Sequence, residues 1–253
     1  MSELNKLIFE AVKDQKDIFG DDLLEQLSIK IPEVTRSVGT EETVISEPKK
    51  NMGQLVEETL KLEDWQRSKS LKELDLKINT CQKCSLGKTR TNFVFGVGNP
   101  DADVIIIGEA PGADEDAKGE PFVGRAGKLL NEILKAINFE REEVFIANIL
   151  KCRPPNNRNP LPEEMTTCIP YLKKQIDIIK PKLILCLGLV AASGVLQLKL
   201  SLTKMRGNVY EFNGVKTMVT YHPAALLRNP NWKRGCWEDV QKFRKLYDEL
   251  TSN

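Results

Sequence analysis

Residues 103–112 read Asp-Val-Ile-Ile-Ile-Gly-Glu-Ala-Pro-Gly, an apolar run that ends in a glycine-rich turn. The apolar run from Val104 to Gly108 is typical of a buried β-strand. The glycines at its end permit a tight turn and a close approach of a ligand to the backbone. The stretch lacks the P-loop lysine pattern and G-x-G-x-x-G, which argues against a nucleotide-triphosphate or dinucleotide site.

Short apolar runs and longer amphipathic stretches alternate from about residue 80 onward. Strand and helix repeated in this way indicate a parallel sheet with helices on both faces. In such sheets ligands bind beyond the carboxyl ends of the strands, and residues 109–112, Asn148 and His222 fall at such ends. The spacing predicts strands over 103–108, 144–150, 183–188 and 216–221, and helices over 127–137, 162–179, 189–198 and 233–250.

The N-terminal part of the chain differs from the rest. Residues 1 to about 30 have helix-like apolar spacing, and 32–51 form a polar stretch typical of a linker. Helical spacing resumes over 53–79. We therefore expect a helical or flexible extension of unknown function over 1–52 and one domain over 53–253. Residues 26–29, Gln-Leu-Ser-Ile, faintly resemble a sliding-clamp-binding peptide, but a helix end explains them better.

Composition excludes several classes of protein. With 41% apolar and 29% charged residues, the chain has the composition of an ordinary globular protein. Its apolar runs are far shorter than the roughly 18–20 residues that span a bilayer, and its N-terminus lacks a secretory pattern. We therefore expect a cytoplasmic protein with no membrane partner. The net charge of +1 gives no argument for a nucleic-acid partner, so any phosphate-binding surface must come from local clustering.

Four of the six cysteines have the spacing of metal ligands. Cys81 and Cys84 form a C-x2-C pair, and Cys152 and Cys168 can complete a four-sulfur site. Zinc and a [4Fe–4S] cluster are both possible for such a site, and core cysteines are the alternative. Cys186 lies in an apolar strand, where we expect a buried side chain, and Cys236 is expected to be structural.

Two further residues could carry chemistry. Phe122 lies in the glycine-flanked sequence Pro-Phe-Val-Gly at 121–124, where an aromatic ring either plugs the core or offers a stacking surface. His222 is the only histidine of the chain. A lone histidine is usually structural, but this one ends a strand and is fixed by a following proline, which favours a functional role.

Taken together, these motifs resemble the family 4 uracil-DNA glycosylases over about residues 78–250. The resemblance implies a three-layer α/β/α domain with a four-stranded parallel sheet, and removal of uracil from single- and double-stranded DNA to leave an abasic site. It implies a [4Fe–4S] cluster rather than zinc on the cysteines. We also expect the protein to be a monomer. The residues that carry the resemblance are Cys81, Cys84, Gly108–Gly112, Pro121–Gly124, Asn148, Cys152, Cys168 and His222–Arg228.

The resemblance assigns roles in a uracil pocket that Gly108, Glu109 and Ala110 line. Phe122 would stack on the base. The Asn148 carboxamide would pair with uracil N3–H and O4, a pattern that cytosine cannot match. The Glu115 region would exclude the methyl group of thymine, because Gly112 stands where another glycosylase family has a tyrosine.

His222 would donate a hydrogen bond to uracil O2 as the base leaves. Ala110 occupies the place of the residue that orients water in other families, so Glu109 is the remaining candidate for that step. Leu226, Leu227 and Arg228 would enter the minor groove. Phosphate contacts could come from Arg153, Arg158, Lys204 and Arg206.

Two competing interpretations remain. One is a non-catalytic nucleic-acid-binding module stabilised by a metal site. The other is a relative that bonds covalently to the abasic sugar through a histidine. That chemistry requires an extra histidine-containing loop, and His222 stands alone.

Overall fold

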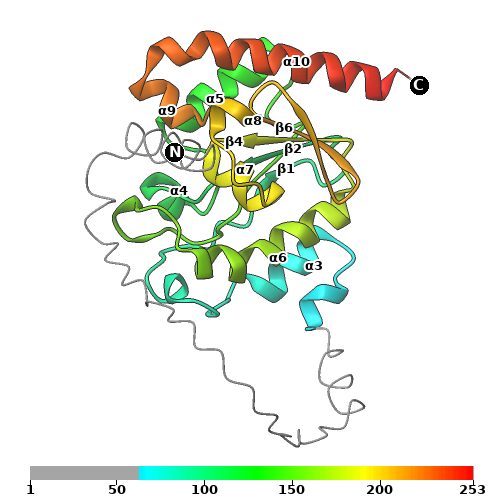
Figure 1. Cartoon of the computed structure of the whole chain (residues 1–253). Coiled ribbons are helices and arrows are strands. Elements are labelled where there is room, and N and C mark those ends of the chain that lie inside the picture. Colours follow the sequence, from blue (N-terminus) through cyan, green and yellow to red (C-terminus); the bar gives the residue numbers. More distant parts are fainter. Residues whose placement is uncertain (1–62, 253) are drawn as a thin grey trace, which may run out of the picture. The chain divides into compact units, whose positions relative to one another are not determined.

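A six-stranded sheet forms the centre of the computed structural model, which describes residues 63–252 (Figure 1). The predicted N-terminal helix, the linker, the clamp-like peptide and the boundary at residue 53 lie outside these residues. The strands are β1 (Val97–Gly98), β2 (Val104–Gly108), β3 (Phe145–Asn148), β4 (Leu183–Leu187), β5 (Val209–Phe212) and β6 (Val215–Thr220).

The strand order is β1-β3-β2-β4-β6-β5. The four inner strands are parallel, which confirms the predicted four-stranded parallel sheet. The two edge strands are antiparallel and were not predicted. β1 has only two residues, and the side chains of β5 are largely exposed, so neither produces the apolar run that identifies a strand in sequence.

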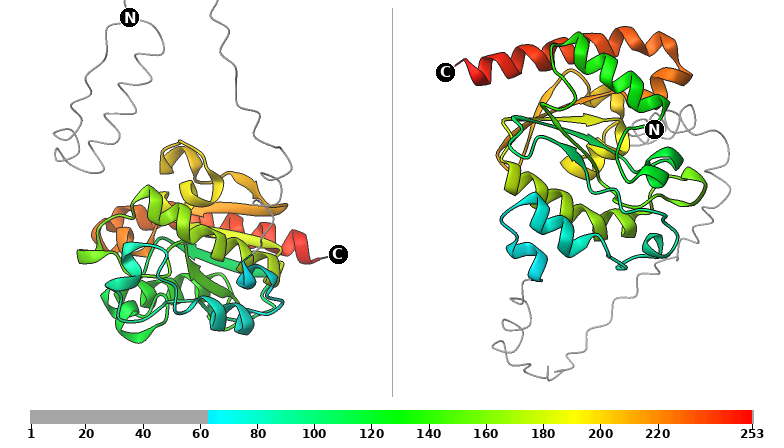
Figure 2. Two further views of the ribbon diagram at one scale, coloured as in Figure 1. Left: turned by 90° about the horizontal axis from the view of Figure 1, so that it is seen from below. Right: turned by 180° about the vertical axis from the view of Figure 1, so that it is seen from behind.

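Helices cover both faces of the sheet, as Figures 1 and 2 show. The helices are α3 (Leu71–Ile78), α4 (Ala113–Lys118), α5 (Arg125–Ala136), α6 (Pro162–Ile179), α7 (Leu189–Leu196), α8 (Leu202–Met205), α9 (Pro223–Arg228) and α10 (Lys233–Thr251), with short 3-10 turns η2 (Asp64–Arg67), η3 (Ser85–Lys88), η4 (Pro155–Asn157) and η5 (Pro230–Trp232).

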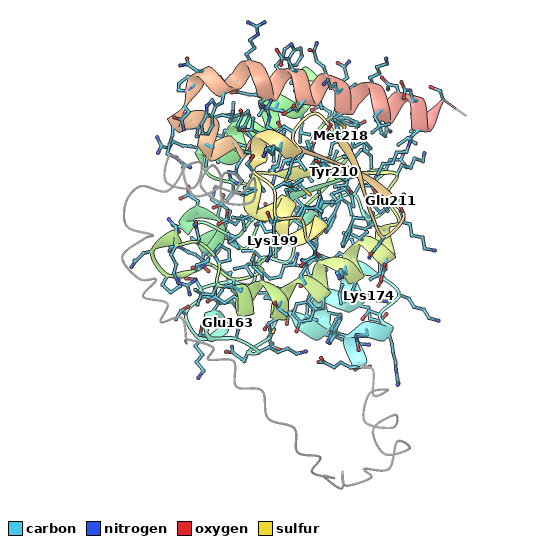
Figure 3. All side chains as sticks on the ribbon, in the orientation of Figure 1. Glu163, Lys174, Lys199, Tyr210, Glu211 and Met218 are labelled. Atoms are coloured by element: carbon cyan, nitrogen blue, oxygen red, sulfur yellow. The ribbon has the colours of Figure 1, made fainter. Side chains whose placement is uncertain are left out.

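Strand β2 contributes to two cores because its side chains alternate between the two faces. Val104 and Ile106 pack with residues of α5, α9 and α10. Ile105 and Ile107 pack with residues of α3, α6 and α7. The sheet is therefore buried on both faces, as expected for inner parallel strands. Figure 3 shows the contrast along the hairpin: Met218 of β6 is buried, whereas Glu211 on the edge strand β5 is exposed.

The long predicted helices are confirmed, and the bounds of α6 agree with the prediction at both ends. Within the described residues, the helical spacing predicted over 53–79 is confirmed over Leu71–Ile78 but not before it. Residues 64–67 form a 3-10 turn, and α3 begins only at Leu71, where the Ser70 hydroxyl accepts a hydrogen bond from Glu73 N at 3.2 Å. A serine N-cap starts a new helix, because it satisfies a backbone donor that the first turn leaves free. None of the helices within 63–252 has the length and the apolar character that a membrane crossing requires.

An ion pair ties α10 to the segment after α8 and to the end of β6. Arg206 Nε lies 2.6 Å from Asp239 Oδ2, which also accepts from Thr220 Oγ1 at 2.7 Å. Both charged side chains are largely buried, with 14% and 5% of their surface exposed. Breaking a buried pair from one side is costly, because an uncompensated charge is left behind.

We expect the substitution Asp239→Ala to lower the free energy of unfolding by about 3–5 kcal/mol, since Arg206 would remain buried without its partner. Urea unfolding measures the change. Glu238→Ala is the matched control, because its exposed ion pair with Arg234 is worth at most about 1 kcal/mol. Equal effects of the two substitutions would contradict the account.

Candidate active site

A pocket of about 390 Å³ opens where β2, β3 and β6 end. The loops that follow these strands converge there, as the sequence predicted. The residues that line the pocket are Glu109–Gly112, Glu115, Phe122, Ala126, Asn148, Pro154, Asn157–Asn159, His222, Ala224 and Arg228.

Gly108 ends β2 and is not itself among the residues that line the pocket, but its neighbours Asn148 and Phe122 are. A Cβ atom at this position would collide with Asn148 Oδ1 and would lie 2.6 Å from Phe122 Cζ. Asn148 is its direct partner on the neighbouring strand β3. The missing side chain therefore lets the amide and the aromatic ring meet at the floor of the pocket.

Phe122 is held in a conformation that its backbone disfavours. Its φ of 54° lies in the left-handed region, where a bulky residue is strained. The Glu115 carboxylate holds the loop in place. It accepts hydrogen bonds from Gly112 N at 3.1 Å, Val123 N at 3.0 Å and Gly124 N at 3.1 Å. Glu115 thus fastens the segment after Phe122 to the loop that follows β2.

Asn148 is 3% exposed, and its side-chain amide makes no hydrogen bond to another of the residues 63–252. The amide atoms are not sealed in the core, because the buried unpaired side-chain atoms of the described residues are Trp65 Nε1 and Ser68 Oγ, and Asn148 lines the pocket. The backbone carbonyl of Asn148, in contrast, accepts from Lys151 Nζ at 3.0 Å. The free amide therefore faces the pocket from a fixed backbone and can bind a ligand that both donates and accepts.

Sequence reasoning missed Lys151, which is fully buried. Its Nζ also donates to Gln175 Oε1 at 2.6 Å, and burial lowers the pKa of its ammonium group to about 8. Apart from its position between Asn148 and Cys152, nothing in the sequence distinguishes this lysine from an exposed one.

His222 is fixed as a neutral hydrogen-bond donor. Its Nδ1 accepts from Ala224 N at 3.1 Å, so the ring proton resides on Nε2. Burial, with a smaller contribution from the Arg228 charge, lowers the pKa of His222 to about 4. The imidazole therefore stays neutral near pH 7 and keeps its Nε2–H free to donate.

Two charged residues complete the pocket. Burial raises the pKa of the Glu109 carboxyl, and the nearby Arg228 guanidinium opposes that shift. Both side chains line the pocket together with Ala110, as expected for Glu109 and Ala110. The charge of the Glu109 carboxyl therefore depends on the balance between its burial and the nearby Arg228 guanidinium.

The three residues predicted to contact DNA have different environments on α9. Leu226 is 1% exposed and packs in the core with α5 and α10, so it is unavailable to DNA and this part of the prediction is wrong. Leu227 is 44% exposed, and Arg228 is exposed at the rim of the pocket. Leucines in sequence look alike, and only the helical phase decides which one packs inward.

All three arginines predicted to bind phosphate have side-chain partners within the described residues. Arg206 pairs with Asp239, and Arg158 forms a two-pronged contact with Glu164 at 2.6 and 2.9 Å. Arg153 donates to Asn157 Oδ1 at 2.8 Å, whereas Lys204 is exposed. These pairings reduce the cations that are free to meet a phosphate.

The four predicted cysteine ligands lie on segments that the fold brings together. Arg90 joins two of these segments, because its Nη1 donates to Cys152 Sγ at 3.1 Å and to Cys81 O at 2.7 Å. Tyr171 OH donates to Cys81 Sγ at 3.3 Å, and Lys151 N donates to Cys168 Sγ at 3.3 Å.

None of these cysteines forms a disulfide. Burial raises the pKa of the Cys152 and Cys168 thiols, the latter to about 12. Across residues 63–252, no three Cys, His, Asp or Glu side chains are arranged as ligands of a single metal ion. The donor set of four thiols beside the cationic Arg90 and Lys151 suits an anionic thiolate-held group. Cys186 and Cys236 are buried, as expected.

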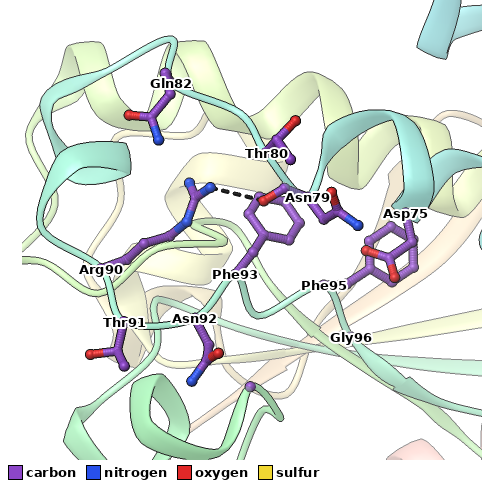
Figure 4. A pocket seen from close by; sticks show the side chains of 11 residues that line it. Asp75, Asn79, Thr80, Gln82, Arg90, Thr91, Asn92, Phe93, Phe95 and Gly96 are labelled. Atoms are coloured by element: carbon purple, nitrogen blue, oxygen red, sulfur yellow. Dashed lines mark hydrogen bonds between the residues drawn. The ribbon is translucent and has the colours of Figure 1, made fainter.

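A second, polar pocket of about 580 Å³ borders the cysteine-bearing segment. Figure 4 shows Arg90 reaching from its wall toward Asn79, whose carbonyl accepts from Arg90 Nη2 at 2.8 Å. Together with the contacts to Cys81 and Cys152, this bond gives the guanidinium a structural role.

Comparison with known proteins agrees with this geometry. The family model of the uracil DNA glycosylase superfamily matches residues 95–248, so the chain belongs to that superfamily. A type-4 uracil-DNA glycosylase of Archaeoglobus fulgidus is 47% identical over 185 residues, which cover 70% of this chain and 93% of the relative.

A type-4 enzyme of Thermotoga maritima is 45% identical over 174 residues, 67% of this chain and 91% of the relative. Within the superfamily the chain is therefore a member of the type-4 uracil-DNA glycosylase family. A type-5 uracil-DNA glycosylase of Pyrobaculum aerophilum is 30% identical over 146 residues, 51% of this chain and 64% of the relative. The family resemblance seen in the sequence is thereby confirmed.

Gly108→Ala tests whether the floor of the pocket depends on the missing side chain. Displacing Asn148 or Phe122 by about 1 Å should slow the reaction at the site by about 100-fold. Single-turnover kinetics of uracil release on a single-stranded oligonucleotide measure the rate. Gly214→Ala is the control for steric contact, because a Cβ there meets nothing within 4 Å; its φ of +79° adds a backbone cost that Gly108→Ala does not have. A Gly108→Ala protein with the wild-type rate would refute this role.

The protonation state of His222 gives a pH prediction. Because the pKa of the ring is lowered, the neutral donor persists from about pH 8 down to about pH 5.5, well below the ordinary histidine pKa of about 6.5. The ratio of wild-type to His222→Ala single-turnover rates should therefore be constant over that range. An inflection of this ratio near pH 6.5 would show that the charged ring is involved.

Proposed function

We propose that this protein is a monofunctional uracil-DNA glycosylase, which hydrolyses the N-glycosidic bond of deoxyuridine in DNA and leaves an abasic site. The observation that carries the proposal is the unpaired Asn148 amide, which lies beside the Phe122 ring at the floor of the pocket. An amide and an aromatic face together suit a planar base with adjacent donor and acceptor atoms. Membership of the type-4 family supports the same activity.

The uracil must leave the base stack to reach this pocket, at a cost of a few kcal/mol. Phe122 offers the ring on which it stacks, a contact worth about 1–3 kcal/mol per base. The centroids of Phe122 and His222 are 5.5 Å apart. A base between them would need about 7 Å, twice a carbon–carbon contact, so His222 meets the edge of the uracil rather than its face.

Asn148 supplies the identity of the base. Its amide oxygen accepts from uracil N3–H, and its amide nitrogen donates to O4. Cytosine has an acceptor at N3 and a donor at C4, so both contacts would be mismatched. Because the Asn148 carbonyl is held by Lys151, the amide is presented from a rigid backbone.

Thymine differs from uracil by one methyl group, which the wall of the pocket must exclude. The Glu115 carboxylate is already engaged by three backbone N–H groups. Its contribution is therefore to fix the loop around Gly112 and Phe122 against the C5 edge of the base. We assign this exclusion to the position of the loop, not to the charge.

Bond cleavage places negative charge on the departing uracil and positive charge on the sugar. His222 Nε2–H donates to O2, where the negative charge develops in the transition state. Removing one such donor typically slows a reaction by ~10² to 10³. Glu109 is the carboxyl available to orient the attacking water and to face the cationic sugar.

Cys81, Cys84, Cys152 and Cys168 would hold a [4Fe–4S] cluster with a structural role. When bound, such a cluster joins separate chain segments through its thiolate ligands. Arg90 and Tyr171 orient two of the sulfurs, and Lys151 N orients a third. The cluster would thereby brace the strand end that carries Asn148.

Leu227 and Arg228 are the α9 side chains available to fill the gap left by the flipped nucleotide. We propose that the protein acts on both single- and double-stranded DNA as a monomer in the cytoplasm. A role of residues 26–29 in clamp binding stays a prediction, since these residues lie outside the described part of the chain.

Asn148→Asp is the direct test of the proposed function. A carboxylate would face uracil O4 with no proton to share, so excision of uracil should fall by up to ~10⁴. Single-turnover release of uracil from one single-stranded oligonucleotide is compared for wild type, Asn148→Asp and Asn148→Ala. An Asn148→Asp rate equal to that of wild type would remove Asn148 from base reading, and no release by wild type would refute the proposed activity.

Metal analysis tests the cluster. Anaerobically purified protein should be brown and contain about four iron and four sulfide per chain. Cys81→Ser should lower both contents, whereas Cys186→Ala should keep them, because Cys186 is a core residue of β4. Stoichiometric zinc without sulfide would contradict the cluster and leave the glycosylase proposal intact.

A further inference from the structure

Three side chains form a stacked column around Tyr221, the residue that follows β6. The Arg206 guanidinium lies 3.9 Å from the centre of the Tyr221 ring. Trp232 also stacks on Tyr221, with ring centroids 5.0 Å apart and an interplanar angle of 16°. Arg206 is fixed by Asp239 at 2.6 Å and donates to the Tyr221 hydroxyl at 2.8 Å. Arg206 and Tyr221 are therefore held in place, and the Trp232 ring stacks on a fixed partner.

Trp232 is the exposed end of this column. It is 39% exposed although Tyr221 stacks on it. A large aromatic side chain that is immobilised and still open to solvent is suited to binding, because little conformational freedom remains to be lost. The pocket described above does not include this residue.

The column lies close to the pocket along the chain. Tyr221 immediately precedes His222, and Arg228 at the rim of the pocket precedes Trp232 by four residues. Four residues span at most about 14 Å. At the duplex rise of about 3.4 Å per nucleotide, this span from Arg228 corresponds to roughly four nucleotides, and to fewer in a more extended single strand.

The charge of this segment suits a nucleic acid. Residues 221–237 contain Arg228, Lys233 and Arg234 and no Asp or Glu, whereas the whole chain has a net charge of only +1. Arg234 makes only an exposed pair with Glu238. An aromatic face within a basic segment is the usual arrangement in proteins that bind single strands.

We propose that Trp232 is a second binding site on the DNA, a platform on which one unpaired base outside the pocket stacks. This inference rests on the proposed function, because it places the strand by the flipped uridine. In a duplex both faces of a base are covered by its neighbours, so the platform serves single-stranded substrates. It would anchor the strand on one side of the uridine while Phe122 holds the base itself.

A scan with wild-type protein tests the platform without any substitution. Single-stranded oligonucleotides carry 2′-fluoro-deoxyuridine, whose fluorine slows cleavage by disfavouring positive charge on the sugar. One base at a time is removed from the four positions on either side. Loss of one particular base should raise Kd by about 5- to 150-fold, the equivalent of one stacking contact. No such position would overturn the proposal.

Substitutions identify the residue responsible. Trp232→Ala should raise Kd for the intact single strand by a similar factor and should abolish the sensitivity to the removed base. Trp232→Phe keeps a smaller ring and should retain part of the affinity. Trp237→Ala is the matched control, because Trp237 is 43% exposed on the neighbouring helix and is not stacked on another ring of the described residues.

The outcomes separate the platform from the glycosylase activity. If Trp232→Ala binds like wild type, or if Trp237→Ala weakens binding equally, the platform is refuted while excision by wild type still supports the proposed function. If duplex binding falls as much as single-strand binding, the stacking assignment is wrong. Absence of uracil release by wild type would instead refute the function on which the platform rests.

Discussion

The close approach that Gly108 permits is the constraint on which the site depends. Because this residue has no side chain, the Asn148 amide and the Phe122 ring both reach the end of β2. In the proposed function, base reading and base stacking would therefore occur at one point, although Asn148 ends β3 and Phe122 lies in the loop between α4 and α5. The strained backbone of Phe122 is held by the Glu115 carboxylate, and Gly127 lets α5 start directly against the Phe122 backbone.

The region of the four cysteines and the uracil pocket share one short segment. Asn148 ends β3, Lys151 binds its carbonyl, and Cys152 follows at once. The amide N–H of Lys151 contacts Cys168 Sγ, and its ammonium contacts Gln175, so α6 is tied to the same segment. A cofactor held by these cysteines would therefore stiffen the strand end that carries Asn148, the residue proposed to read the base, even without contact between cofactor and substrate.

Much of this arrangement could be predicted from sequence, because it rests on patterns of short range. Buried parallel strands are continuous apolar runs, so β2 and β4 were recognisable, and the residues at their carboxyl ends had to converge. Most side chains of the edge strand β5 are exposed or half-buried, so it has no continuous apolar run and was not predicted. The burial of Lys151 and Leu226 and the pairing of Arg206 with Asp239 depend on tertiary contacts that no local pattern encodes.

The most direct measurement is a crystal structure of the protein with uracil bound. We expect one uracil per chain, stacked on Phe122, with N3–H and O4 within hydrogen-bond distance of the Asn148 amide and O2 facing Nε2 of His222. The ring should lie beside His222 rather than between the two rings. Uracil bound in another pocket, or bound here with its N3–O4 edge turned away from Asn148, would contradict the account.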